Sequence, residues 1–322
     1  MNSFAKIFVF LNSIALIVLP RRFAPLPFLL GACYITIQQG INIGPFYFHV
    51  IRILILVGVL RVISKGERIA GGMTRLDWLI VMYATWALIS SFFRPDIKGA
   101  LVFRLGLAFN TCGIYFLLRI ICQSIDDLRN LFCLLALVLM PIAFEMIYEH
   151  IGSHNLFSFF GGVPSVPVIR EGNIRAQGPF RHAILAGTVG AVCFPLMVSL
   201  WNQCRKIAVS GILACVSMVI ASSSSGPLAS LFAGICGLCM WRYRHRMKFL
   251  RWMSFIGYIV LALVMSSPPY YLMGRIPLVA GSTGWHRAEL INSAFRHINE
   301  WWFWGTDYTR HWMVTGVSWS SD

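Results

Sequence analysis

GNIRAQGPFRHAILAG, residues 172–187, separates two long apolar segments, and the rest of the chain can be interpreted outward from it. It places three basic side chains at the mouth of the apolar segment that follows: Arg175, Arg181 and His182. Gly178 and Pro179 are expected to bend the backbone between them. Basic side chains beside a bilayer suit an anionic, lipid-linked substrate. The alternative is a solvated loop with ordinary flanking charges.

The composition around this stretch indicates a multi-pass membrane protein. Of the 322 residues, 57% are hydrophobic and 12% are charged, whereas soluble domains carry about 25% charged residues. A segment in hydrocarbon must satisfy its own backbone hydrogen bonds, which a helix does. The sequence therefore predicts an all-α, multi-pass transmembrane helix bundle.

About ten apolar segments approach the roughly 20 residues that a spanning helix needs. The predicted segments are Phe4–Leu19, Phe23–Ile41, Phe46–Val62, Trp78–Phe93, Ala100–Ile121, Leu131–Ile151, Ala183–Trp201, Ile207–Ser222, Leu228–Trp241 and Trp252–Met265. Because several are short, some are expected to tilt or to span only partly.

The basic residues between segments predict the orientation of the chain. The first, third, fifth, seventh and ninth loops carry Lys or Arg, and the ninth reads RYRHRMKFLR, residues 242–251. These loops are expected on the cytoplasmic side. The sixth loop, 152–182, and everything after Met265 are then expected on the outer face. The side of the N-terminus depends on whether both of the first two segments span. The sequence thus divides into a bundle, 1–265, and an outer-face segment, 266–322.

The outer-face segment is expected to contain an amphipathic interfacial helix over 282–302. Ser282 or Thr283 is the predicted N-cap. One helical face carries apolar residues: Ala288, Ile291, Phe295 and Ile298. Tryptophans follow at 301, 302 and 304, and such residues favour the membrane interface.

Several other classes of site are not expected. The net charge of +15 is spread over short loops, so no basic domain is present to bind nucleic acid. His150 and His154 have i, i+4 spacing, but Gly152 and Ser153 interrupt the helix there, so no metal site is predicted. No phosphate-cradling glycine loop is present, and no cofactor is expected.

The clearest ionisable side chains within predicted membrane segments are Arg52, Arg104 and Glu145. Each is expected either to snorkel to the interface or to find a partner inside the bundle. A pairing of Glu145 with one of the two arginines is one such arrangement.

Three stretches, in this order, resemble segments of the O-antigen ligase and O-antigen polymerase superfamily of bacterial membrane proteins. They are RAQGPFRHAILAG (175–187), ASSSSGPLAS (221–230) and WHRAELINSAFRHINEWWFWGTD (285–307). The first looks like the family's Arg-x-x-Gly-x-Phe segment, the second like its Ser/Gly-rich helix start, and the third like its outer-face helix.

This resemblance implies a C-type glycosyltransferase in the bacterial inner membrane. Such an enzyme moves a glycan from undecaprenyl pyrophosphate to a glycan or lipid acceptor at the outer face. Arg175 and Arg287 match family arginines and are the implied pyrophosphate contacts, and Arg181 is a further candidate. The family's catalytic histidine lies beyond the glycine matched by Gly305, which makes His311 a candidate base. His182 is the second candidate.

Two other classes of function fit the same composition. A transporter or flippase of a lipid-linked or anionic solute would be expected to contain internal repeats, and no convincing repeat is visible. A non-catalytic scaffold of polysaccharide assembly is the third interpretation. Since the family continues with further membrane segments, the resemblance also implies that its C-terminal part is missing after Asp322, and that these 322 residues alone do not catalyse transfer.

Overall fold

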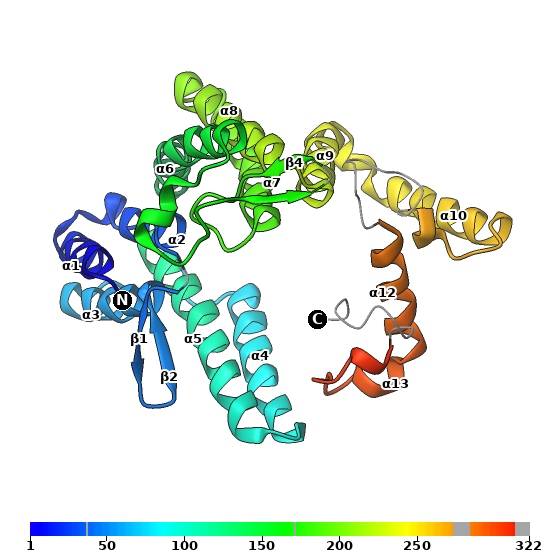
Figure 1. Ribbon diagram of the computed structural model, residues 1–322, viewed down its shortest axis with the longest axis horizontal. Helices are drawn as coiled ribbons and strands as arrows, with labels where there is room; N and C mark the ends of the chain where they lie inside the picture. Colours follow the sequence, from blue (N-terminus) through cyan, green and yellow to red (C-terminus); the bar gives the residue numbers. More distant parts are fainter. Residues whose placement is uncertain (37, 171, 273–283, 313–322) are drawn as a thin grey trace. The chain divides into compact units, whose positions relative to one another are not determined.

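The computed structural model describes residues 1–36, 38–170, 172–272 and 284–312. The chain forms two compact units, Met1–Leu231 and Phe232–Asp322, and each is described by itself. Both are predominantly helical (Figure 1), as the sequence predicts.

The first unit consists of helices with two small antiparallel hairpins. Its elements are α1 (Ser3–Val18), α2 (Leu26–Tyr34), β1 (Gly40–Ile43), β2 (Phe46–His49), α3 (Val50–Lys65), α4 (Arg75–Ile89), α5 (Ile97–Ile121), α6 (Ile125–Gly152), β3 (Val168–Arg170), β4 (Asn173–Arg175), α7 (Ala183–Ser199), α8 (Arg205–Ala221) and the first part of α9 (Ser225–Met240). The second unit contains the rest of α9, then α10 (Met247–Val264), α12 (Gly284–Arg296) and α13 (Ile298–Trp301).

Four helical stretches among the described residues are long and apolar enough to cross a membrane: Arg75–Phe93, Ile97–Ile121, Ile125–Gly152 and Ser225–Val264. Ten spans are not confirmed. The predicted segments Phe23–Ile41 and Phe46–Val62 differ most from the structure, because hairpin β1–β2 occupies part of both and α2 has only 9 residues. A helix of that length rises about 14 Å, well short of a bilayer core.

Two apolar cores hold the first unit together. One joins α6, α7 and α8, with Leu139 and Ile142 of α6 fully buried beside Met218 of α8. The other joins α1, α3 and α5, with Leu16 and Leu54 at its centre. In the first core, a Cβ on Gly190 of α7 would lie 2.7 Å from the Cys215 carbonyl oxygen of α8. The absence of a side chain there lets the two helices approach closely.

Helix α10 shows the surface expected of a lipid-facing segment. None of its residues is buried within the chain, and its exposed side chains include Phe249, Trp252, Phe255 and Leu263. A continuous apolar surface of this size is unfavourable in water. It is stable in hydrocarbon, which supports assignment of the chain to a membrane.

The predicted amphipathic helix, 282–302, forms as two pieces, α12 and α13, interrupted at His297. Its proposed caps Ser282 and Thr283 lie outside the described residues. Two tyrosines of the preceding 3-10 turn, Pro269–Tyr271, hold α12: Tyr270 donates to Asn292 over 3.0 Å, and Tyr271 donates to Glu289 over 2.6 Å.

The predicted orientation can be tested by labelling single cysteines at two exposed positions in a background without native cysteines. Asn173→Cys is expected to react with a membrane-impermeant thiol reagent in intact cells, because its loop alternates with the basic loops assigned to the cytoplasm. Arg244→Cys is expected to react only after permeabilisation. Labelling of position 244 but not of 173 in intact cells would contradict this orientation.

A second prediction concerns the contact of α7 with α9. A Cβ on Gly187 would collide with Ser222 Oγ and lie 2.8 Å from Pro227 Cβ. Gly187→Ala is therefore expected to destabilise the fold by about 1–3 kcal/mol through overpacking, measured by thermal unfolding in detergent. Gly237→Ala is the control, because its Cβ would meet nothing within 4 Å. Equal stability of the two variants would show that α7 and α9 are not closely packed here.

Candidate functional site

Arg175 ends strand β4, at the point where the chain turns toward α7. Hairpin β3–β4 pairs Val168 with Arg175, which fixes the register of this end. The Arg175 Nη2 atom donates to Ser224 Oγ over 2.5 Å, and the next backbone N–H, of Ala176, donates to the Ala221 carbonyl over 3.1 Å. Two of the stretches that carry the family resemblance, 175–187 and 221–230, are therefore in direct contact.

The guanidinium of Arg175 is partly buried and has no carboxylate partner among the described residues. Its Nε atom is buried, and no described residue offers it a hydrogen-bond partner. Burial, with the nearby charge of Arg170 adding to it, lowers the pKa of Arg175 from its ordinary value. A buried cation without a counterion is costly. The site can lower this cost by accepting an anion.

Glu149 fixes the loop that follows Arg175. This side chain of α6 is fully buried. Its Oε2 atom accepts hydrogen bonds from the backbone N–H groups of Gln177, at 3.0 Å, and Gly178, at 2.8 Å. Its Oε1 atom accepts from Asn155 Nδ2 at 3.2 Å. These bonds tie the loop to α6.

Gly178 fits this anchored turn because of its backbone conformation and the space available. Its φ is +56°, a left-handed value that favours glycine. A Cβ there would lie 3.1 Å from Glu145 Oε2. The bend that the sequence predicts between the basic residues is therefore present. The sequence did not predict that this bend would contact α6.

Glu145 does not pair with Arg52 or Arg104, the arrangement considered above. Its Oε1 accepts from the Leu156 N–H over 3.1 Å, and its buried Oε2 has no partner among the described residues. Arg52 instead donates to Asn110, and Arg104 donates to the Ala87 carbonyl and to Ser90. All three side chains therefore bond locally within the first unit.

Arg181 and His182 are both exposed immediately before α7. The His182 carbonyl accepts the first backbone bonds of the helix, from Leu185 and Ala186, and its side chain does not cap it. The imidazole of His182 is thus accessible to a ligand, and His182 is close to Arg175 in the sequence.

Arg287 and His311 lie in the second unit. Arg287 is half-buried on α12. Since Arg175 belongs to the first unit, the predicted convergence of the two arginines on one head group stays a prediction.

His311 belongs to a cluster that the sequence did not indicate. In the 3-10 turn Arg310–Trp312, the His311 Nε2 atom lies 2.8 Å from Glu300 Oε2, and the ring stacks on Tyr308. His297 Nδ1 lies 2.7 Å from Glu300 Oε1. Hydrogen bonds from Trp312 and from His297 lower the pKa of Glu300 to about 2.

The ligand atoms of His297, Glu300 and His311 lie within 4.8 Å of one another, so the three side chains could hold a metal ion. Two imidazoles and a carboxylate are common zinc ligands. Of this cluster, only the i, i+3 spacing of His297 and Glu300 is visible in the sequence. His311 reaches these two residues through a turn, which no spacing in the sequence predicts. By contrast, His150, of the pair considered in the sequence, bonds the Ile174 carbonyl at 2.8 Å.

Comparison of the chain with family models, curated proteins and solved structures gave no match. The functional conclusion therefore rests on the residues and their geometry, together with the resemblance of three stretches.

Proposed function

We propose that the chain is a multi-pass glycosyltransferase of the C type in the bacterial inner membrane. It moves a glycan from undecaprenyl pyrophosphate to a glycan or lipid acceptor at the outer face. In this proposal, the apolar helices too short to count as spans complete the bundle by extending into flanking polar residues that snorkel to the interface, or by locally thinning the bilayer.

The observation that carries the proposal is the partly buried guanidinium of Arg175, which has no carboxylate partner among the described residues and is held by Ser224 beside an anchored turn. A pyrophosphate leaving group offers several oxygens, which match the planar fork of an arginine. Because the turn is anchored by Glu149, the guanidinium is already in place before a ligand arrives. A donor positioned in advance stabilises the charge that develops as the leaving group departs.

The reaction follows from these groups. An acceptor hydroxyl oxygen forms a bond to the anomeric carbon while the bond from that carbon to the pyrophosphate oxygen breaks. The electron pair leaves on the lipid pyrophosphate, where Arg175 and Arg287, with Arg181 as a further candidate, stabilise the negative charge. The hydroxyl proton passes to a base, for which His311 and His182 are the candidates.

A reconstituted assay tests the proposal. Proteoliposomes containing the full chain receive an undecaprenyl-pyrophosphate-linked oligosaccharide labelled on the glycan, together with candidate acceptors. The expected result is a labelled acceptor together with free undecaprenyl pyrophosphate in equal amounts. The proposal thereby departs from the expectation, drawn above from the resemblance, that these 322 residues alone are inactive.

The same assay separates the alternatives. Movement of the intact lipid-linked glycan across the bilayer, without cleavage, would replace the proposal by a flippase. The absence of both transfer and transport, in protein shown to be folded, would favour a scaffold and overturn the catalytic proposal.

A further inference from the structure

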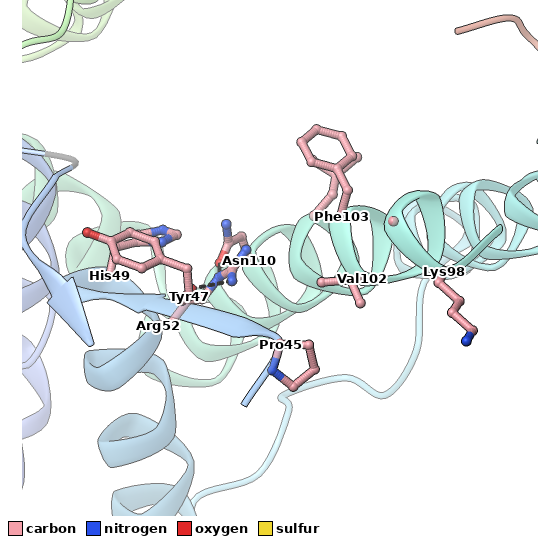
Figure 2. Close-up of a pocket in the computed structure, with 10 residues that line it drawn as sticks. Pro45, Tyr47, His49, Arg52, Lys98, Val102, Phe103 and Asn110 are labelled. Carbon is pink, nitrogen blue, oxygen red and sulfur yellow. Dashed lines mark hydrogen bonds between the residues drawn. The ribbon is translucent and has the colours of Figure 1, made fainter. Parts of the chain in front are cut away.

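A hollow of about 610 Å³ lies between hairpin β1–β2, the start of α3 and the first turns of α5, away from Arg175 in sequence. Figure 2 shows four polar side chains grouped toward one end of the hollow: Tyr47, His49, Arg52 and Asn110. Lys98 lies apart from them, at the start of α5. Its volume is within the range of ligand pockets.

Arg52 is held in a fixed position at this hollow. Its Nε donates to Asn110 Oδ1 over 3.1 Å, and its Nη1 donates to the Tyr47 carbonyl over 2.6 Å. A Cβ on Gly106 would collide with Nη2 of the same guanidinium, so the arginine packs directly on the backbone of α5. Little side-chain freedom is left to lose when a ligand binds.

The charge of the hollow is not balanced by its own lining. Among the described residues, the lining includes Arg52, Lys98 and His49 but no acidic side chain. The nearest carboxylate in sequence, Asp96, caps α5 by accepting from the Gly99 N–H over 3.0 Å. A cavity lined by one sign of charge attracts the opposite sign. The ligand is therefore expected to be an anion.

The rest of the wall is apolar. Val102, Phe103 and Leu107 form it along α5. A second hollow, of about 430 Å³, lies beside Arg52 and is lined otherwise by apolar residues and Gly106, including Phe46 and Phe48 of β2. Alternation along this strand sends Tyr47 and His49 toward the first hollow and the two phenylalanines toward the second. Apolar side chains thus lie on both sides of the Arg52 guanidinium, where they offer a contact surface to hydrocarbon.

We propose that this hollow binds the phosphate of an anionic lipid, with Arg52 contacting the head group, Lys98 attracting it from the other end of the hollow, and the hydrocarbon lying along the apolar wall. A soluble phosphate would use the cations and leave that wall bare. Asn110 and Tyr47 each take one of the five N–H groups of Arg52, so the other three remain for the phosphate oxygens, and the more distant lysine adds a point charge. The site is separate from the Arg175 turn and does not depend on the proposed glycosyl transfer.

The test uses the full chain, purified in a neutral detergent and titrated with phosphatidylglycerol, with bound lipid counted by native mass spectrometry. Phosphatidylcholine with the same acyl chains has the same phosphodiester but no net head-group charge, so it controls for hydrocarbon and phosphate contacts without net charge. The wild type is expected to bind phosphatidylglycerol about tenfold more tightly, because the hollow is lined by cations that repel the choline ammonium. Inorganic phosphate at the same concentration is expected not to displace it.

Variants locate the site. Arg52→Gln is expected to reduce affinity for phosphatidylglycerol to that for phosphatidylcholine. Gly106→Ala retains the charge but displaces the guanidinium, and is expected to weaken binding about fivefold. Lys98→Gln, at an exposed position that should not affect folding, is expected to weaken it about threefold. Lys65→Gln, at the other end of α3, is the charge-matched control and is expected to match the wild type.

Equal binding of the two lipids by the wild type would overturn the proposal. So would wild-type affinity in both Lys98→Gln and Gly106→Ala. Displacement of phosphatidylglycerol by an equal concentration of inorganic phosphate would assign the site to a soluble anion and overturn the lipid part of the inference.

Discussion

Arg175→Ala is expected to lower glycan transfer at least about a hundredfold, the usual effect of removing one preorganised donor from developing negative charge. The amount of folded protein should stay near that of the wild type. Arg175 forms one side-chain hydrogen bond, to Ser224, and its Nε has no partner among the described residues. Removing this charge costs the fold little and also relieves the burial of an unpaired cation.

Two further variants separate charge from geometry. Arg175→Lys retains the charge but loses the fork, and is expected to lower transfer about tenfold. Arg170→Ala is the matched control, because this exposed arginine lies on the partner strand of the same hairpin. It is expected to retain near wild-type transfer. If Arg175→Ala were as active as Arg170→Ala in the reconstituted assay, Arg175 would not be the pyrophosphate contact.

Elements with a strong local signal could be predicted from the sequence. The segment predicted at Ala100–Ile121 corresponds to α5, Ile97–Ile121, because a long apolar run ends there at a polar loop. Hairpin β1–β2 could not be found this way. Its strands have 4 residues each and are themselves apolar, so in composition they continue the neighbouring helices.

The candidate site was predictable only in part, for a similar physical reason. Arg175 is notable in the sequence because it lies in a long loop predicted to face outward, between two long apolar segments. Its contact with Ser224, 49 residues later, depends on how α7, α8 and α9 pack, which no spacing rule encodes. Glu149 has no signature either, because its partners are mostly backbone N–H groups, which every sequence supplies.

Glu149→Ala is expected to be the most destabilising single substitution near the site. It removes the acceptor of three donors at once, the N–H groups of Gln177 and Gly178 and the side-chain amide of Asn155. A buried donor without a partner costs about 1–3 kcal/mol. Since water can enter and accept hydrogen bonds from some of these three donors, the expected loss of unfolding free energy is about 2–5 kcal/mol.

Thermal unfolding in detergent and limited proteolysis of residues 172–182 measure this effect. Ile151→Ala, at an exposed position near the end of α6, is the control and is expected to leave both nearly unchanged. Glu149→Gln retains one oxygen for the two backbone donors but points an amide NH2 at Asn155, so its cost should be smaller, about 1–2 kcal/mol. Stability of Glu149→Ala within the range of Ile151→Ala would show that the loop does not depend on this carboxylate.

The same substitution connects the fold to the proposed chemistry. Glu149 holds the backbone of residues 177 and 178, two and three positions after Arg175, without reaching the guanidinium itself. If it acts by positioning, Glu149→Ala assayed below its unfolding temperature should still bind lipid-linked glycan but transfer it slowly, because a mobile cation loses the benefit of orientation. Arg175→Ala should lose both binding and transfer. Identical losses in the two variants, in folded protein, would instead place Glu149 in contact with the substrate.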